Sequence, residues 1–445
     1  MNQNNNNTDF QIEDLEWLKK AGIETSWKNM RGRRWAAPQH YTCSYMAMFP
    51  PELPHYFIQK FTNEGDIVLD PFSGRGTTPV EAMAQNRIGI GNDFNDLAFS
   101  LTKGKIANPS LEDVIKRLQR LKRNYHKTNY QDFSEVPDKI KMIYHENTLC
   151  QLLYLKEKLK WEKKDIDSFI VMVLMGAMHG SSTGFLSVSM PNTFSMGWNY
   201  VENYIQKHNL KKPDRDVFEV LEKRCKRFLD KGNLPGSGIA LFGDSKNLVK
   251  NNQDILKSGA IDLIFSSPPY LKVIKYGLYN WIRLWWLVGS HEGVDERLDD
   301  THSLKPYLEF MKEIMKEMIS LINPDSGLVC WVIGDVKKIS KTGGKTINLA
   351  EEVAKISKDV EGINSNGVKS KYKILGIIDD KIEDEHKVTK IWNSDDLEED
   401  KSGKATSIDR ILIMCLDSCD YMNMKIKSNS EISWDPIIEK PLSNN

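Results

Sequence analysis

The sequence FTNEGDIVLDPFSGRGTT, residues 61–78, carries the strongest fold signal in the chain. It reads as a loop, a buried strand over Asp66–Asp70, and a sharp turn that contains Gly74 and Gly76. A helical pattern follows, and then a second short strand over Arg87–Asn92. A strand, a glycine turn, a helix and a strand within about 25 residues form a βαβ unit, which predicts a parallel sheet.

The α/β pattern returns after a long interruption. Further strands are predicted in five stretches: GIALFGDSKNL (238–248), IDLIFSSPPY (261–270), GLVCWVIGD (327–335), YKILGIIDDKI (372–382) and SIDRILIMCL (407–416). The last two are separated by a long charged loop, and PYLEFMKEIMKEMISLI has the periodicity of an amphipathic helix.

These patterns predict an α/β fold class with one split catalytic domain. Its two parts are residues 46–104 and 236–425, and residues 105–235 form a largely helical insertion between them. Residues 1–45 are a basic and aromatic N-terminal segment, and residues 426–445 are a C-terminal tail.

The composition of the 445 residues excludes several classes of protein. With 40% apolar residues the chain is too apolar for wholesale disorder, and with 61 basic and 61 acidic residues it is not a uniformly basic DNA-coating protein. The longest apolar run, Phe169–Met178, is about half of a membrane span. The six cysteines show no CxxC pairs, so we expect no metal site. The N-terminus lacks a secretory signal pattern, and we expect a cytoplasmic protein.

The glycine turn has the features of a nucleotide site. Gly74 and Gly76 allow the chain to turn sharply and a ligand to approach the backbone. Asp93 follows Asp70 at a spacing that suits a carboxylate bound to a ribose diol. Thr77 and its neighbours replace the third glycine of a pyrophosphate loop, and no Walker lysine follows, so an adenosine ligand without phosphates fits better. Asp244 is placed to reach the adenine, or else caps a helix.

A second motif, Ser267-Pro268-Pro269-Tyr270, ends a buried strand. Consecutive prolines remove two backbone donors, which leaves a rigid edge rich in acceptors beside the flat ring of Tyr270. Acceptors beside an aromatic ring suit the exocyclic amino group of a nucleobase that has swung out of its stack.

Together the two motifs resemble the S-adenosylmethionine-dependent amino-methyltransferases of DNA, which methylate cytosine N4 or adenine N6. LDPFSGRGTT (69–78) looks like the family's cofactor motif and SPPY like its catalytic motif, while FPPELPHYFIQKF (49–61) looks like the segment over the methionine end of the cofactor. The resemblance implies a Rossmann-like methyltransferase sheet with helices on both faces. Because sequence-reading segments are inserted at variable points in this family, it also implies that residues 105–235 are a candidate DNA-recognition region, with a scaffold as the alternative. It also implies cofactor contacts from a set of turn and strand-end residues: Asp70, Pro71, Phe72, Gly74, Gly76, Thr77, Asp93 and Asp244.

Within this family SPPY is usual for cytosine-N4 enzymes, whereas adenine-N6 enzymes more often carry an aspartate or asparagine before PPY. The resemblance therefore implies that Ser267, Pro268, Pro269 and Tyr270 act on a flipped cytosine. An adenine-N6 enzyme, an RNA base-amine methyltransferase and a catalytically silent DNA-binding module stay open as alternatives. The expected partners are double-stranded DNA and a cognate restriction endonuclease.

Local basic surface has to supply any DNA affinity, because the net charge is zero. Arg31, Arg33, Arg34 and Trp35 form a basic and aromatic cluster, and Arg120 and Arg123 belong to a basic stretch in the insertion. We expect the arginines to contact the DNA backbone, with a solvated helix surface as the alternative for the insertion. The stretch His179–Trp198 suits a groove or a flipped-base pocket, with an ordinary loop as its alternative. Among the aromatic residues after SPPY, Tyr276 or Tyr279 is expected near that pocket.

Overall fold

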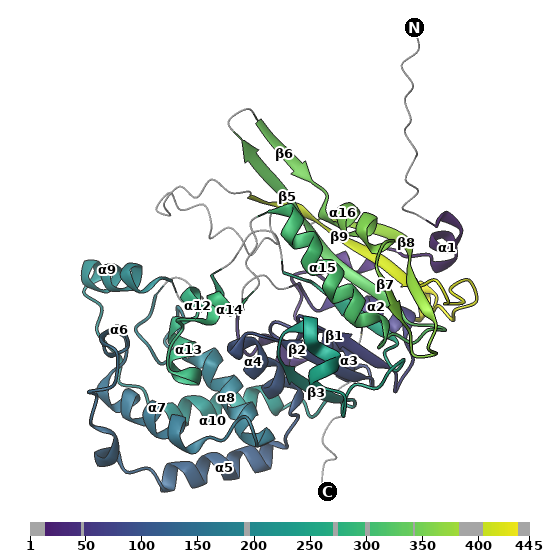
Figure 1. Ribbon diagram of the computed structural model, residues 1–445. Coiled ribbons are helices and arrows are strands. Elements are labelled where there is room, and N and C mark those ends of the chain that lie inside the picture. Colours follow the sequence, from purple (N-terminus) through teal and green to yellow (C-terminus); the bar gives the residue numbers. More distant parts are fainter. Residues whose placement is uncertain are drawn as a thin grey trace, which may run out of the picture.

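The computed structural model describes residues 14–45, 49–190, 196–269, 275–298, 303–340, 343–381 and 404–434 (Figure 1). Its central element is a sheet with the strand order β3-β2-β1-β4-β5-β9-β8-β7, to which β6 adds as a partner of β5. The strands are β1 (Ile67–Asp70), β2 (Ile88–Asp93), β3 (Ser237–Phe242), β4 (Leu263–Ser266), β5 (Leu328–Ser340), β6 (Gly343–Ile347), β7 (Glu361–Ile363), β8 (Lys369–Lys381) and β9 (Lys404–Leu416).

Strands β1 to β5 pair in parallel, and β9 lies antiparallel between β5 and β8. The order 3-2-1-4-5 is that of a doubly wound Rossmann sheet. The structure therefore confirms the predicted α/β class and the Rossmann-like sheet. All seven strands expected from the sequence form. The hairpin strand β6 and the short edge strand β7 were not expected, because neither has a distinctive alternating pattern.

Helices cover both faces of the sheet. One layer holds α2 (Glu52–Phe61), α3 (Thr77–Ala84) and α4 (Asp96–Ile106), and the other holds α15 (Leu304–Ile319) and α16 (Leu349–Ser357). Consecutive residues of β1 belong to two different apolar clusters: Val68 to the cluster that contains Phe57 of α2, and Leu69 to the cluster that contains Met315 of α15. This alternation is the reason why a strand buried on both sides reads as a continuous apolar run.

The helical insertion shares its core with helices of the sheet domain. It contains α5 (Leu111–Arg123), α6 (Asp138–Lys141), α7 (Glu146–Lys158), α8 (Asp165–Ala177), α9 (Trp198–His208) and α10 (Val217–Leu229). Leu97 of α4 and Trp281 of α13 belong to the same apolar cluster as the central helix α8. The helices after β4, which are α12 (Tyr276–Tyr279), α13 (Trp281–Val288) and α14 (Val294–Arg297), therefore pack with the insertion.

The predicted N- and C-terminal segments pack onto the sheet domain as far as they are described. Helix α1 (Leu15–Ala21) follows Asp14, whose N–H donates to the Leu375 carbonyl at 3.1 Å. Near the other end, Lys60 of α2 donates to the Lys427 carbonyl at 3.1 Å. The remaining short elements are α11 (Leu248–Asn251) and the 3₁₀ helices η1 (Ser26–Met30), η2 (Pro38–Tyr41), η3 (Lys127–Tyr130), η4 (Ser245–Asn247) and η7 (Asn429–Glu431).

Within the described ranges, no helix has the length and apolarity needed to cross a membrane. The apolar run Phe169–Met178 lies mostly in α8, at the centre of the helical core. The charged loop expected after residue 382 lies outside the described residues up to position 403.

Candidate functional site

The two sequence motifs meet at the carboxyl ends of β1 and β4. These neighbouring parallel strands pair Val68 with Leu263 and Leu69 with Ile264. The strand order reverses between them, and such a switch point is where open α/β sheets bind ligands. Ser266, the last residue of β4, donates from its Oγ to Oδ1 of Asp70, the last residue of β1. The two motifs are therefore joined by a direct side-chain hydrogen bond.

The glycine turn between β1 and α3 depends on positive backbone angles. Gly74 has φ +50° and Gly76 has φ +79°. A Cβ at Gly76 would lie 2.9 Å from Oγ1 of Thr102, so α3 and α4 approach each other closely here. A Cβ at Gly74 would lie 3.6 Å from the ring of Tyr45, which covers the turn. The turn is thus held by close packing on two sides.

Asp93 connects the turn to β2. Its Oδ2 accepts from the Gly74 N–H at 2.8 Å, and its Oδ1 accepts from the Asn95 N–H at 2.9 Å. Burial raises the pKa of Asp93 to about 6 against the lowering effect of these bonds. A carboxylate offers about four acceptor positions. Asp93 therefore keeps acceptor capacity for hydroxyl donors while it orders the turn.

Asp70 is 1% exposed and is only partly satisfied. Its Oδ1 accepts from Ser266 and from the Phe72 N–H, the latter at 3.1 Å, while its buried Oδ2 has no hydrogen-bond partner among the described residues. Burial raises its pKa to about 7, although the hydrogen bond from Ser266 acts in the opposite direction. A buried acceptor without a partner indicates a place for a donor from a ligand.

Four other residues of the predicted cofactor set lie around the turn. The Pro71 carbonyl accepts from Ser245 Oγ at 2.6 Å. The Phe72 ring packs against Phe310 with a centroid distance of 5.7 Å, and Thr77 is buried as the first residue of α3. Asp244 caps η4 by accepting from the Lys246 N–H at 2.9 Å. This contact agrees with the alternative interpretation, in which Asp244 caps a helix.

The catalytic motif is described for its first three residues. Ser267 is partly exposed, Pro268 is buried and Pro269 is exposed, whereas Tyr270 lies outside the described residues. After this loop, the Tyr276 ring stacks on Tyr45 at 5.6 Å with an interplanar angle of 18°. Because Tyr45 also covers Gly74, one aromatic pair connects the glycine turn with the segment after the catalytic motif. The expected place of Tyr276 near a flipped-base pocket stays a prediction.

Sequence reasoning missed two residues of this region, Tyr45 and the buried Arg283. The guanidinium of Arg283 donates to the Ser44 carbonyl at 3.0 Å, to the Met175 carbonyl at 3.1 Å and to Asn280 Oδ1 at 3.0 Å. It thereby joins the segment before α2, the end of α8 and the start of α13. Neither residue stands in a motif, so only the folded chain identifies them.

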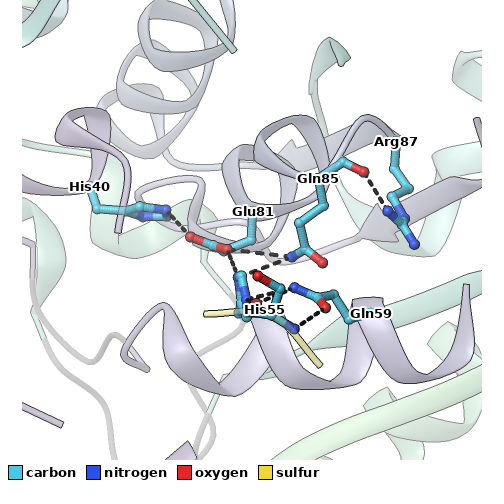
Figure 2. Close-up of polar contacts among 7 residues, drawn as sticks. His40, His55, Gln59, Glu81, Gln85 and Arg87 are labelled. Atoms are coloured by element: carbon cyan, nitrogen blue, oxygen red, sulfur yellow. Dashed lines mark hydrogen bonds and ion pairs between the residues drawn. The ribbon is translucent and has the colours of Figure 1, made fainter. Parts of the chain in front are cut away.

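A buried polar network lies behind α3 (Figure 2). Glu81 of α3 contacts His40 Nε2 at 2.6 Å and His55 Nδ1 at 2.8 Å, and Gln59 contacts His55 Nε2 at 2.9 Å. Burial by itself raises the pKa of Glu81, but the hydrogen bonds to the two histidines outweigh it and lower the pKa to about 2. The network anchors α3 to α2. Among the residues that the structure describes, no three His, Cys, Asp or Glu side chains are arranged to hold a metal ion.

His179 is a packed polar residue. It is 1% exposed, and its Nδ1 lies 2.8 Å from Ser187 Oγ. Burial lowers the pKa of His179 to about 4.

The expected DNA contact of Arg31 is wrong. Its side chain is 7% exposed and forms an ion pair with Asp380 of β8, and it also donates to the Lys381 carbonyl at 2.9 Å. Trp27 donates to the same Asp380 at 3.1 Å. Arg31 therefore attaches the N-terminal segment to the sheet, because a cation that is buried against a carboxylate is not accessible to a phosphate group.

The other predicted DNA-contacting arginines are exposed. Arg33 and Arg34 are at the surface beside the η1–η2 connection, with Arg34 5.8 Å from the centroid of the Tyr41 ring. Arg120 and Arg123 are exposed on α5. Other cations of α5 are engaged: Lys116 pairs with Glu112, and Arg117 pairs with the buried Asp167 at 2.7 Å.

Comparison with known proteins gives a family match over the first part of the chain. Residues 3–103, which include the glycine turn and Asp93, match a family model described as DNA methylase that groups N6 and N4 enzymes. The match covers less than half of the chain. The methylase match ends well before the Ser267 motif, so the structure and not the match connects the two parts of the site.

Curated relatives carry methyltransferase names. The chain is 29% identical over 161 residues to the Type II methyltransferase M.MjaII of Methanocaldococcus jannaschii. The aligned region covers 35% of this chain and 30% of that protein. It is also 32% identical over 92 residues to the orphan methyltransferase M.BamHII of Bacillus amyloliquefaciens. This aligned region covers 20% of this chain and 35% of that protein. The chain thus spans about a third of the length of these relatives.

Among solved structures, the rRNA methyltransferase aviRa from Streptomyces viridochromogenes aligns over 86% of this chain and 90% of its own. The identity is 9% and the TM-score is 0.30, a likeness that carries no argument about substrate.

Proposed function

We propose that the protein transfers a methyl group from S-adenosylmethionine to the exocyclic N4 of a cytosine that is flipped out of double-stranded DNA. The observation that carries the proposal is the junction at the switch point, where the Ser266–Asp70 hydrogen bond joins the glycine turn to the Ser267-Pro268-Pro269 loop. The turn has the features of a nucleoside site and the loop those of an acceptor-rich edge.

The residues around the turn fit S-adenosylmethionine. The unpartnered buried Oδ2 of Asp70 suits the methionine ammonium group, and the spare acceptor capacity of Asp93 suits the ribose hydroxyls. The positive φ of Gly74 leaves the turn open to close approach of a ligand. When bound, S-adenosylmethionine supplies an electrophilic methyl group on its sulfonium centre.

The catalytic loop prepares the base nitrogen. The lone pair of an exocyclic amino group is conjugated into the ring, so the enzyme has to localise it. Ser267 Oγ and the Pro268 carbonyl accept hydrogen bonds from the two N–H groups of that amino group. These hydrogen bonds direct the nitrogen lone pair toward the methyl donor. Tyr270 stacks on the flipped base. No covalent attack on the ring is required, which agrees with the absence of a Pro-Cys pair from the sequence.

Cytosine N4 is favoured over adenine N6 by the serine of SPPY, as the family resemblance implies. The adenine-N6 enzyme is the second candidate, and the family model that matches residues 3–103 groups both kinds. The Ser267 hydroxyl can accept a hydrogen bond from an N–H of either amino group, so it suits both candidates.

DNA is the proposed partner, with phosphate contacts from the exposed Arg33, Arg34, Arg120 and Arg123. A cognate restriction endonuclease is a further proposed partner, suggested by the Type II name of the first relative.

One assay tests the function. The protein is incubated with labelled S-adenosylmethionine and either unmethylated genomic DNA or bulk RNA, and the polymer is then digested to nucleosides. Labelled N4-methyldeoxycytidine supports the proposal, and labelled N6-methyldeoxyadenosine replaces it with the second candidate. Label in RNA alone contradicts the DNA substrate, and cofactor binding without transfer indicates a catalytically silent module.

A further inference from the structure

Helix α9 (Trp198–His208) is the most exposed of the longer helices in the described insertion. Its sequence is WNYVENYIQKH, and only Val201 is buried. Tyr204 and Ile205 pack partly against the helical core, while Trp198 and Tyr200 are 40% and 39% exposed. The helix therefore rests on a narrow apolar contact and presents most of its circumference to solvent.

The face of α9 opposite this contact is built from carboxamides. At 100° per residue, Asn199, Asn203 and Gln206 lie within a sector of about 60° that points directly away from Val201. All three are exposed, and no side-chain hydrogen bond is recorded for them within the described residues. An outward row of three carboxamides at positions i, i+4 and i+7 stabilises nothing in the fold. Asn in a helix is also unfavourable by propensity, so the row needs another explanation.

A carboxamide row has a matching chemical partner in the major groove of DNA. Asn and Gln offer one acceptor and two donors, and they pair in bidentate fashion with N6 and N7 of adenine. The major groove admits a single α-helix. Carboxamides carry no charge, and the charge for phosphate attraction is supplied by neighbours: Lys207, Lys211 and Lys212 are exposed at the end of the helix and just beyond it.

The helix is kept stiff and tied to the catalytic side of the molecule. The Tyr200 and Tyr204 rings stack at 6.1 Å, and the Tyr204 ring lies 4.2 Å from His208, which makes a ladder of rings along one side. Trp281 of α13 donates from Nε1 to the Met196 carbonyl at 2.8 Å, just before α9 begins. Since α13 follows the catalytic loop in sequence, this bond links the start of α9 to the segment behind the site. Figure 1 shows α9 at the edge of the helical region opposite α5.

We propose that α9 reads base sequence in the major groove through Asn199, Asn203 and Gln206, with adenine-containing base pairs as the preferred targets. The inference rests on the proposed function, because it takes double-stranded DNA as the substrate. It assigns to one helix the selection of the methylated site, and it leaves the methyl transfer itself to the switch-point residues.

The test compares the wild-type protein with the Asn199→Ala, Asn203→Ala, Gln206→Ala triple variant. Both are incubated with S-adenosylmethionine and a double-stranded DNA library of randomised sequence, and methylated positions are located by single-molecule sequencing. We expect a defined consensus for the wild type. For the variant we expect loss of the preference at the adenine positions of that consensus. Discrimination between consensus and non-consensus sites should fall at least 10-fold, since a bidentate contact accounts for about 1–3 kcal/mol.

Two controls keep the result interpretable. Gln253→Ala removes an exposed carboxamide outside α9 and is expected to keep the wild-type consensus. Unchanged affinity for S-adenosylmethionine and an unchanged helical circular-dichroism signal show that the triple variant is folded. A variant that methylates the wild-type consensus with wild-type discrimination overturns the assignment of α9 and leaves the proposed function intact. A wild-type protein that methylates no DNA overturns the proposed function itself.

Discussion

Ser266 and Ser267 are adjacent residues in different surroundings, and we propose different roles for them. Ser266 is buried and hydrogen-bonded to Asp70, whereas Ser267 is partly exposed beyond the end of β4. The first serine belongs to the junction between β1 and β4, and the second belongs to the surface that we propose meets the base.

Replacing Ser267 by alanine is expected to lower turnover by on the order of 10²-fold, because one acceptor for the amino group is lost. The affinity for S-adenosylmethionine should stay close to that of the wild type, as measured by calorimetry. Ser266→Ala is the matched comparison, and it should weaken cofactor binding because Asp70 loses its partner. Equal loss of turnover and affinity in Ser267→Ala would contradict the role assigned to this residue.

Gly76→Ala tests the packing of the glycine turn. The substitution meets two costs, the positive φ of +79° and a contact of 2.9 Å with Thr102 Oγ1. Gly65→Ala is the control, since Gly65 has φ +85° with nothing within 4 Å of the added Cβ. We expect a loss in unfolding free energy of about 1–2 kcal/mol for Gly65→Ala from backbone strain alone, and a larger loss for Gly76→Ala. Equal losses in urea denaturation would show that Thr102 adjusts without cost.

The buried carboxyl of Asp70 predicts a pH dependence of stability. Burial raises its pKa to about 7, compared with about 4 in an unfolded chain. Between these values the folded protein binds more protons than the unfolded chain, so stability falls as the pH rises through this window. Asp70→Asn does not titrate. Its unfolding free energy relative to the wild type should therefore increase from pH 5 to pH 8, by on the order of 2–4 kcal/mol. A constant difference between the two proteins would contradict a raised pKa at this site.

At the scale of elements, the N-terminal segment is attached to β8 by buried charge. Arg31 pairs with Asp380, and Trp27 donates to the same carboxylate. A basic stretch in a sequence does not distinguish an arginine that meets a phosphate from one that meets a buried carboxylate. Only the position of Asp380, almost 350 residues further along the chain, decides between the two.

Removal of Arg31 is therefore expected to affect stability and not DNA binding. Arg31→Ala leaves Asp380 buried without its cation, which costs about 3–5 kcal/mol in unfolding free energy. Its exposed neighbour Arg33 serves as the control, and Arg33→Ala should change stability by less than about 0.5 kcal/mol. Thermal denaturation measures both. A stable Arg31→Ala protein with weakened DNA binding would restore the original interpretation of Arg31.

At the scale of the whole molecule, a net charge of zero means that any DNA affinity has to arise from local surface. Many basic residues of the insertion are already used within the fold. Arg117 is bound to Asp167 across α5 and α8, and Lys156 donates to the Trp285 carbonyl at 2.6 Å. Arg120 and Arg123 are exposed cations on α5, which lies at the opposite edge of the helical region from α9 (Figure 1).

The salt dependence of DNA binding tests the α5 surface. If Arg120 and Arg123 each neutralise one phosphate, the double variant Arg120→Ala, Arg123→Ala should have a shallower salt dependence. The slope of the logarithm of the DNA association constant against the logarithm of the salt concentration should become less negative by about 2. Lys116→Ala is the control on the same helix, because Lys116 is paired with Glu112. Fluorescence anisotropy with duplex DNA measures the slope, and an unchanged slope would exclude α5 from the DNA interface.

The sequence by itself determined the fold class, the strands on both sides of the switch point and the local form of the glycine turn. These features depend on residues close together in the chain: apolar runs that suit a sheet buried on both faces, and glycines that permit positive φ. The seven strands predicted from such patterns are all present.

Tertiary structure alone decided which of the candidate residues meet. The Ser266–Asp70 bond spans 196 positions, and Tyr45 reaches Tyr276 and Gly74 from a segment without a motif. The uses of Arg31, Arg283 and the outward carboxamides of α9 also depend on partners, or on the lack of them, that are distant in the chain. Local patterns specify backbone geometry and burial, whereas charge pairing and site assembly depend on contacts that exist only after the sheet and the helical core have packed together.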